Sequence, residues 1–368
     1  MVSPVTEARP LAWRLHVDLP MIFGLLVLSS IGLVVLYSAD GAEFGLVSRQ
    51  AVRLGVAFTV MFLIAQVSPR HLMYWAPWLY AVGVLLLLAV LLIGDVQMGA
   101  RRWIRFGPFN FQPSEMAKLT VPLMVAYYLT DRPLPPRLDR VLVAAVLVII
   151  PTLLIARQPD LGTALLIASS GCFALFLGGL RWGLIAVGVV LAGAGAPVLW
   201  MFMHDYQRRR VLTFLDPEQD PLGAGYHIIQ SKIAIGSGGM YGKGWLNGTQ
   251  SRLDFLPERS TDFVFSVFSE EFGLLGVAAL LSVYLVVVLR GLWIASNAQE
   301  SWGRIVAGSL ILTFFIYVFV NIGMVSGLLP VVGLPLPLVS YGGTSMVTLM
   351  AGFGVVMSIH THRRLLSQ

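Results

Sequence analysis

Long apolar stretches separated by short polar connections make up most of the chain between residues 19 and 360. The stretches are continuous and not alternating, and each is about long enough to cross a hydrocarbon core of roughly 30 Å. Because only helices and closed barrels satisfy their backbone in lipid, continuous runs indicate helices. We predict about ten spans, at 19–37, 51–67, 74–94, 115–129, 140–156, 161–179, 183–203, 263–289, 304–328 and 341–359.

This pattern predicts an all-α polytopic membrane protein that forms a single domain over residues 1–368. One long connection is expected at about 204–262, and a loop of that length without structure of its own is uncommon. Its semi-apolar pieces, such as 226–235, therefore predict short helices along the membrane surface. An even number of spans places both termini on one side, and the arginine distribution favours the cytoplasm for them and the outer face for the long loop.

Composition excludes an ordinary soluble domain, because 57% of the residues are hydrophobic, 12% are charged and the mean hydropathy is +0.80. The net charge of +6 is scattered among loops. It indicates topology and contact with anionic lipids, not nucleic-acid binding. The single cysteine, Cys172, excludes an intrachain disulfide and a cysteine-rich metal site.

Charged residues concentrate in the segment 250–263, directly before an apolar run. Asp254, Glu258 and Asp262 follow one another at intervals of four, with a proline that opposes an uninterrupted helix. Asp262 could be the N-cap of the span that begins at Phe263, as aspartate often is. An outer-face carboxylate beside low-dielectric helices is also expected to have a raised pKa, which suits a general base. The two interpretations are compatible.

A second polar motif, QPSEMAK at 112–118, opens the fourth predicted span. Glu115 and Lys118 are three residues apart and could pair locally, which contributes only about 0.2–0.5 kcal/mol on an exposed helix. Each charge costs about 2.5–3.5 kcal/mol within a membrane. Local pairing alone therefore does not account for them, and the motif indicates a functional cavity.

Two outer loops carry further candidates. Arg101 and Arg102, together with Arg105, lie on the side that the topology rule disfavours, which indicates an anionic partner there. The tight loop 157–163 contains Asp160, and the loop alone is best explained as a turn in which Asp160 caps the next helix.

Glycines crowd the segment 236–244, but their spacing does not fit a phosphate-binding loop. Ser237 stands where that pattern needs glycine, and Gly244 stands where it needs serine or threonine. A tightly turning loop is favoured. Lys232, just before it, is a candidate contact for an anion.

Proline and paired glycines at 335–345 mark an irregular re-entrant piece before the last span. Such backbone is tolerated at membrane depth only where protein or a wet cavity covers it. The hydroxyls of Ser340, Thr344 and Ser345 could bind a substrate or cap the last helix.

Five motifs in this order resemble those of the SEDS family (shape, elongation, division and sporulation). They are QPSEMAK (112–118), QPDLGT (158–163), FLPER (255–259), TDF (261–263) and LVSYGGTS (338–345), and with the spans the resemblance covers residues 19–360. Two positions depart from the family pattern. Ser260 stands where many relatives have histidine, which excludes an imidazole there, and Asp254 replaces a glutamate while keeping the carboxylate.

The resemblance implies a bacterial glycosyltransferase that polymerises the peptidoglycan precursor lipid II on the outer face of the cytoplasmic membrane. The reaction is expected to invert the anomeric configuration, and a role in cell elongation is preferred over one in division. It implies that Asp262 is the essential aspartate of the TDF motif, and we expect it to be the general base. The expected substrate-binding residues are Glu115, Lys118, Arg101, Arg102, Asp160, Lys232, Asp254, Glu258, Ser340, Thr344 and Ser345.

The partners implied by the resemblance are lipid II, the growing lipid-linked strand, a class B penicillin-binding protein and other elongation-complex proteins. Membrane lipids are expected as well, and nucleic acid is not. No cofactor and no metal ligand is assigned, although the carboxylates could recruit a divalent cation or pair with arginines. A lipid II flippase stays open as an alternative, since buried charges and broken helices are typical of transporters, as does a membrane scaffold without chemistry. Polar motifs gathered on one face favour catalysis.

Overall fold

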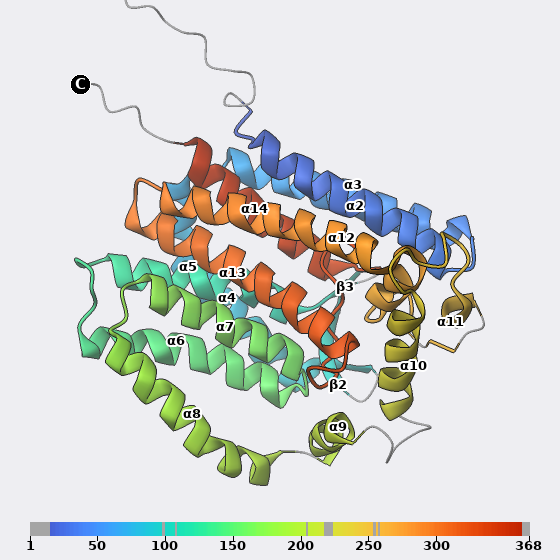
Figure 1. Cartoon of the computed structure of the whole chain (residues 1–368). Helices are drawn as coiled ribbons and strands as arrows, with labels where there is room; N and C mark the ends of the chain where they lie inside the picture. Colours follow the sequence, from blue (N-terminus) through green and yellow to red (C-terminus); the bar gives the residue numbers. More distant parts are fainter. Residues whose placement is uncertain are drawn as a thin grey trace, which may run out of the picture.

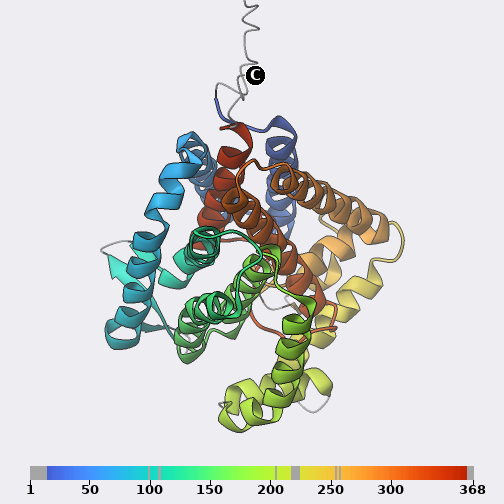
Figure 2. The same ribbon diagram turned by 90° about the vertical axis from the view of Figure 1, so that its left-hand side faces the viewer.

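The computed structural model describes residues 15–97, 100–106, 109–203, 205–216, 224–252, 255–256 and 258–362 (Figures 1 and 2). Most of the described chain is helical. The helices are α2 (Leu19–Ala39), α3 (Phe44–Gln66), α4 (Pro69–Ile93), α5 (Pro113–Thr130), α6 (Leu138–Arg157), α7 (Leu161–Leu177), α8 (Trp182–Phe202), α9 (Asp205–Leu215), α10 (Ala224–Ser237), α11 (Thr249–Arg252), α12 (Val264–Ser296), α13 (Ser301–Val325) and α14 (Thr344–Thr361).

Each predicted span contains one long helix, from α2 to α8 and from α12 to α14. Among the described residues, 7 of these helices are long and apolar enough to cross a membrane. Two more, α7 and α8, are apolar but shorter over their described parts, and α5 carries Glu115 and Lys118 in its first turns. The prediction of an all-α polytopic membrane protein with about ten spans is confirmed.

The bundle is built around α13 and α14. Within their most apolar windows, 67% of α13 and 72% of α14 is buried, compared with 22% of α3 and of α4. α13 packs against α5, α7, α10, α12 and α14, and α14 also packs along α3. A helix that is apolar on all sides is expected in such a central position. The outer helices surround this pair, and α8 lies at the edge of the bundle near α9 (Figures 1 and 2).

A small antiparallel sheet connects α4 to α5, which the sequence did not predict. Its strands are β1 (Asp95–Gln97), β2 (Ala100–Phe106) and β3 (Phe109–Phe111), in the order β1-β2-β3. Val96 pairs with Arg101, and Ile104 pairs with Phe111. Strands of 3 and 7 residues are too short to give a periodic signal beside the long apolar runs. The sheet lies outside the spans, so the class of the fold is unchanged.

The long connection 204–262 contains three short helices, α9, α10 and α11, as expected from its semi-apolar pieces. α10 packs against α12 and α13. The Ser231 hydroxyl lies 2.7 Å from the Ser266 hydroxyl and donates to the carbonyl of Val325 at 2.5 Å. These contacts fix the connection against the end of the bundle where α12 begins and α13 ends.

A break in α12 receives the glycine-rich segment. Gly273 has φ 63° and ψ −165°, so the helix is interrupted there. The amide of Leu274 donates to the carbonyl of Gly239 at 2.9 Å, which joins the two segments. A Cβ at Gly242 would lie 2.0 Å from the carbonyl oxygen of Glu271, so only glycine fits at that contact. The glycines therefore form a tightly turning loop that docks on α12.

An ion-pair cluster joins α2, α12 and α14 at the end of the bundle where α2 begins. Buried Asp18 caps α2 by accepting from the amide of Met21 at 2.9 Å. It also accepts from the guanidinium of Arg290 at 3.1 and 2.6 Å, and His360 Nε2 lies 3.4 Å away. Charge-assisted, two-pronged hydrogen bonds of this kind are among the stronger polar contacts. The cluster holds three spans together at this end.

Replacing Gly273 by alanine should destabilise the protein for two reasons. The new Cβ would lie 2.3 Å from the amide nitrogen of Gly242, and the alanine backbone would have to keep a positive φ. Such strain costs on the order of 1–3 kcal/mol, before the steric clash is counted. Thermal unfolding of purified Gly273→Ala should show a lower midpoint than wild type. Gly55→Ala in α3, where nothing lies within 4 Å of the added Cβ, is the control. Equal midpoints for Gly273→Ala and wild type would contradict this prediction.

Candidate active site

The segment before α12 folds into a compact turn that presents Asp262. The amides of Thr261 and Phe263 donate to the carbonyl of Glu258 at 3.1 and 3.2 Å, and the Thr261 hydroxyl donates to the Glu258 carboxylate at 2.7 Å. α12 begins at Val264 with Phe263 as its N-cap and without a side-chain cap. The interpretation of Asp262 as the N-cap is therefore wrong, because the helix starts one residue later and its N-cap is Phe263.

Asp262 has an electrostatic environment suited to a base. The pKa of its carboxyl is raised from 3.8 to about 6, chiefly because burial opposes the charged form; the neighbouring Glu258 also raises the pKa, and Arg210 of α9 partly lowers it. On one side of the carboxylate, Oδ2 lies 3.4 Å from the position that a Cβ on Gly333 would take. The carboxylate thus lies between the long connection and the segment that links α13 to α14.

Tyr317 of α13 is the common neighbour of the predicted charged residues. The charges of Lys118, Glu115, Asp262 and Asp160 all act on its phenol. Lys118 Nζ lies 5.0 Å from the centroid of the Tyr317 ring and donates to Glu115 at 2.8 Å. The second oxygen of Glu115, Oε2, has no hydrogen-bond partner within the part of the chain that the structure describes. The structure therefore places Lys118 of the QPSEMAK motif against the Tyr317 ring, with Asp160 and Asp262 close enough for their charges to act on it.

Asp160 caps α7, as the sequence indicated. One carboxylate oxygen accepts from the amide of Thr163 at 3.3 Å. The other accepts from Gln112 at 3.2 Å and lies 3.9 Å from Arg102 Nε, while Arg102 also donates to the carbonyl of Pro159. The cap connects α7 to β2 and to the start of α5. A role for Asp160 or Arg102 in substrate binding stays a prediction.

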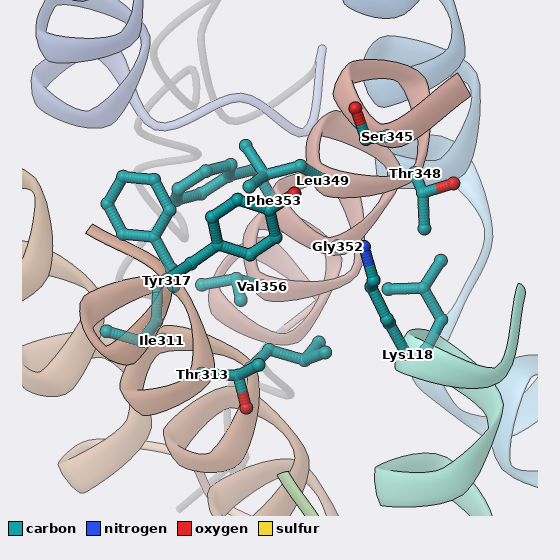
Figure 3. A pocket seen from close by; sticks show the side chains of 13 residues that line it. Lys118, Ile311, Thr313, Tyr317, Ser345, Thr348, Leu349, Gly352, Phe353 and Val356 are labelled. Atoms are coloured by element: carbon teal, nitrogen blue, oxygen red, sulfur yellow. The ribbon is translucent and has the colours of Figure 1, made fainter. Parts of the chain in front are cut away.

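The hydroxyl residues before α14 divide into two groups. Ser340 is buried, donates to the carbonyl of Thr261 at 2.5 Å and accepts from the amide of Leu336 at 2.7 Å. Ser345 lines an apolar pocket together with Lys118, whereas Thr344 is the first residue of α14 (Figure 3). The pocket lies between α5, α13 and α14, and its other walls are mainly apolar, formed by residues such as Phe353 and Val356.

Comparison with known proteins identifies the family of the chain. The family model described as Cell cycle protein, that of FtsW, RodA and SpoVE, matches residues 11–365. The chain belongs to this family. It is 56% identical over 356 residues to the peptidoglycan glycosyltransferase MrdB of Escherichia coli strain K12, covering 96% of each protein. It is 33% identical over 424 residues to the peptidoglycan glycosyltransferase RodA of Treponema pallidum, covering 94% of this chain and 98% of that protein.

Solved structures give the same result. One is a chain from a structure of a peptidoglycan synthase complex that coordinates polymerization and crosslinking. It matches with a TM-score of 0.82 and 34% identity, over 94% of this chain and 99% of that chain. Another is the rod shape determining protein RodA of Thermus thermophilus, with a TM-score of 0.71, 32% identity, and coverage of 93% and 96%. The RodA-like resemblance of the five motifs is therefore confirmed at the level of the family.

Lys118, Glu115, Asp160 and Asp262, which contact Tyr317 or act on it through their charge, form the Tyr317 cluster. Several other predicted residues of this FtsW/RodA/SpoVE protein are not part of that cluster. Glu258 is exposed but next to Asp262. Lys232 is exposed on α10, where its side chain lies across Gly327. Arg101 belongs to β2, and the structure describes no placement for its side chain. Asp254 lies outside the described residues. Substrate binding by each of them stays a prediction.

The sequence reasoning missed Tyr317 and Asn321 of α13, Arg210 of α9, Gln50 of α3 and Glu270 of α12. Tyr317 and Asn321 are isolated polar residues within an apolar span, a signal that was present but unused. Arg210 ends a run of three arginines in the long connection. None of the five could be linked to Asp262 from sequence, because their partners are far away along the chain.

Among the described residues, no set of three or more His, Cys, Asp and Glu side chains is arranged to hold a metal ion. Recruitment of a divalent cation by the carboxylates stays a prediction.

Glu270 holds the outer loop onto α12. Its fully buried carboxylate accepts from Lys243 Nζ at 2.7 Å, from the amide and hydroxyl of Thr249 at 2.8 and 2.9 Å, and from the amide of Gln250 at 3.1 Å. This carboxylate fixes the start of the segment that leads to Asp262. Glu270 is therefore the structural anchor of the loop that carries the candidate base.

Glu270→Ala should destabilise the protein strongly, because Lys243 and two backbone amides lose their acceptor. Breaking one side of a buried ion pair costs about 3–5 kcal/mol. We expect a lower thermal midpoint and faster proteolysis within 243–252. The matched control is Glu300→Ala, which removes an exposed pair with Arg70 at 3.7 Å and should cost less than about 1 kcal/mol. Similar midpoints for the two variants would show that Glu270 is no anchor.

Proposed function

We propose that this chain is a peptidoglycan glycosyltransferase, which polymerises lipid II into glycan strands at the outer face of the cytoplasmic membrane during cell elongation. The similar protein of Escherichia coli strain K12 is named a peptidoglycan glycosyltransferase and matches the chain over almost its full length. The observation that carries the proposal is the partly buried Asp262 carboxyl, which has a pKa of about 6 and belongs to the Tyr317 cluster.

The proposed reaction needs a base for one hydroxyl proton. The carboxylate of Asp262 accepts the proton of the 4-hydroxyl on the GlcNAc of incoming lipid II. The hydroxyl oxygen attacks the anomeric MurNAc carbon at the lipid-linked end of the growing strand. As the new C–O bond forms, the bond from that carbon to the pyrophosphate breaks, so undecaprenyl pyrophosphate leaves and the anomeric configuration inverts. Asp262 then releases its proton to water.

A pKa near 6 suits this role. The carboxyl is mostly ionised at neutral pH, yet it is a stronger base than an exposed aspartate. Burial thus makes the carboxylate more basic. The positive charge of Arg210 lowers the pKa, which helps to keep the carboxyl ionised at neutral pH. The same arrangement explains why the site lies at the edge of the bundle, where water can still accept the proton.

Two cations near the site support stabilisation of the leaving pyrophosphate. Arg210 donates to the carbonyl of Val331 at 3.2 Å and is close enough to act on Asp262. Lys118 lies against the ring of Tyr317 and is paired with Glu115. Positive groups fixed beside a developing diphosphate stabilise the transition state more than mobile ones do.

The pocket between α5, α13 and α14 fits the lipid part of the substrate. Lys118 and Ser345 lie at its polar end, and Leu349, Phe353 and Val356 continue along its apolar wall (Figure 3). An undecaprenyl chain is apolar and carries its diphosphate at one end. We propose that isoprene units occupy this pocket while the diphosphate stays near Lys118.

Orientation and partner belong to the same proposal. The arginine distribution supports cytoplasmic termini, and with that orientation Asp262 and the starts of α5, α7 and α14 would face the extracytoplasmic side. A solved peptidoglycan synthase complex that couples polymerization and crosslinking resembles the chain over 94% of its length. It supports a class B penicillin-binding protein as the partner, with lipid II and the lipid-linked strand as substrates.

A polymerisation assay on purified protein tests the function. With lipid II and the penicillin-binding partner, wild type should make glycan strands, while Asp262→Asn should lose at least about 100-fold in rate, as expected for loss of a general base. The exposed Asp139→Asn should behave as wild type. At pH 8, Asp262→Asn should unfold no earlier than wild type, because burial opposes the ionised carboxyl. Strands from Asp262→Asn at the wild-type rate, or lipid II crossing liposome bilayers without strands, would overturn the proposal.

The pH profile gives an independent test. Because the base must be ionised, the rate should fall as pH drops through about 6 and then about tenfold for each further pH unit. Glu258→Gln removes a like charge, so its midpoint should move to lower pH. Arg210→Gln removes the opposite charge, so its midpoint should move to higher pH. Identical acid limbs in all three proteins would mean that another group titrates.

A further inference from the structure

Three consecutive carbonyl groups of the Asp262 loop receive hydrogen bonds from outside the loop. The amide of Tyr341 donates to the carbonyl of Ser260 at 2.8 Å, and the Ser340 hydroxyl donates to that of Thr261 at 2.5 Å. The side-chain amide of Asn321 donates to the carbonyl of Asp262 itself at 3.0 Å. The backbone that carries the base is therefore held at every residue from 260 to 262.

Asn321 links this loop to the chain that follows α13. Its Nδ2 also donates to the carbonyl of Leu334 at 2.6 Å, so one amide group bridges two segments. The residue is 0% exposed and comes from α13, the central helix of the bundle. Its Oδ1 has no hydrogen-bond partner among the described residues, so the two donated bonds are its described polar contacts.

Gln50 of α3 also holds the segment that follows α13. Its Nε2 donates to the carbonyl of Ser340 at 3.1 Å, and its Oε1 accepts from the amide of Gly342 at 3.3 Å. Gln50 is 2% exposed on α3. The segment 334–342 is thus fixed by α3 and by α13, and it in turn fixes the carbonyls of Ser260 and Thr261.

A purely structural explanation would be that irregular backbone at membrane depth needs donors wherever they are available. The arrangement is more specific than that. Burying a polar side chain in an apolar bundle is costly, and one of the two hydrogen bonds that Asn321 donates goes to the residue that carries the base. A fixed carbonyl fixes the Cα of Asp262, which leaves only side-chain rotation to place the carboxylate.

We propose that Asn321 is a positioning residue of the glycosyl transfer, whose amide clamps the Asp262 backbone to the segment 334–342 so that the carboxylate meets the acceptor hydroxyl. This inference rests on the proposed function. Asn321 touches neither sugar nor diphosphate. Its loss acts through Asp262, so it lowers kcat and leaves the KM for lipid II nearly unchanged. A displacement of about 1 Å at a reacting group can cost about 100-fold in rate.

The test compares Asn321→Ala with Ser309→Ala in lipid nanodiscs. Ser309 is a matched control, because it is fully buried on the same helix and its hydroxyl donates, among the described residues, to the carbonyl of Val306 in that helix. Asn321→Ala should lose about 100-fold in kcat per folded molecule, with KM within about threefold of wild type. The acid limb of its pH profile should move below about 6, because the freed carboxyl reaches water more easily. Ser309→Ala should match wild type in all three measures.

A second variant keeps the inference testable if Asn321→Ala does not fold. Asn321→Ser keeps one donor and cannot bridge both carbonyls, so its kcat should lie between those of wild type and the alanine variant. Wild-type kcat and an unmoved acid limb in a folded Asn321→Ala or Asn321→Ser protein would overturn the inference. Lower yield of folded protein with normal kcat per folded molecule would overturn it as well, because that is the signature of a structural role.

Hydrogen–deuterium exchange separates this inference from the proposed function. In Asn321→Ala, but not in Ser309→Ala, the amides of 258–263 should exchange faster because the loop is no longer clamped. This readout needs no activity. Unchanged exchange in Asn321→Ala would overturn the clamp even if wild type polymerises lipid II, whereas faster exchange with an inactive wild type would support the clamp and overturn the function.

Discussion

A carboxylate held at the boundary between water and an apolar helical bundle is the constraint around which the rest of this structure is arranged. Burial opposes the ionised form of Asp262, Glu258 adds to that effect, and Arg210 offsets part of it. The carboxyl is therefore mostly ionised at neutral pH and yet more basic than an exposed aspartate. Holding such a group in place requires neighbours that are themselves fixed, because a mobile loop would expose the carboxylate to water and lose the effect.

The fixed neighbours come from elements far apart along the chain. The segment 334–342 crosses the bundle between α13 and α14, where the Tyr284 hydroxyl donates to the carbonyl of Pro337 at 2.6 Å. α2 approaches so closely that a Cβ at Gly32 would lie 2.5 Å from the carbonyl oxygen of Leu338. Glu270 and the break at Gly273 dock the preceding loop on the same end of the bundle. The opposite end, around Asp18 and Arg290, joins helices, and a separate pocket near that end is lined by Arg70, Glu300 and His362.

The sequence predicted those features that short segments encode by themselves. The spans follow from apolar runs of membrane length, and the cap at Asp160 follows from a tight turn before α7. The short helices of the long connection follow from its semi-apolar pieces. The motif residues around Tyr317 could be named because charged residues in apolar surroundings are conspicuous.

The remaining features depend on contacts between distant segments. Asn321 and Asp262 are 59 residues apart, and Gln50 and Ser340 are 290 apart, so no local pattern pairs them. The sheet of β1 to β3 is too short for a periodic signal, and the start of α12 was misplaced by one residue because an aspartate before an apolar run resembles an N-cap. Tertiary packing decided each of these cases.

The account depends most directly on the protonation of Asp262. Infrared difference titration of wild type against Asp262→Asn isolates the carbonyl stretch of this one carboxyl as the pH is lowered. The account predicts that the protonated band appears with a midpoint of about 6. A midpoint near 3.8, the value of an ordinary aspartate, would contradict it, because the carboxyl would then lack the burial on which its role as a base depends.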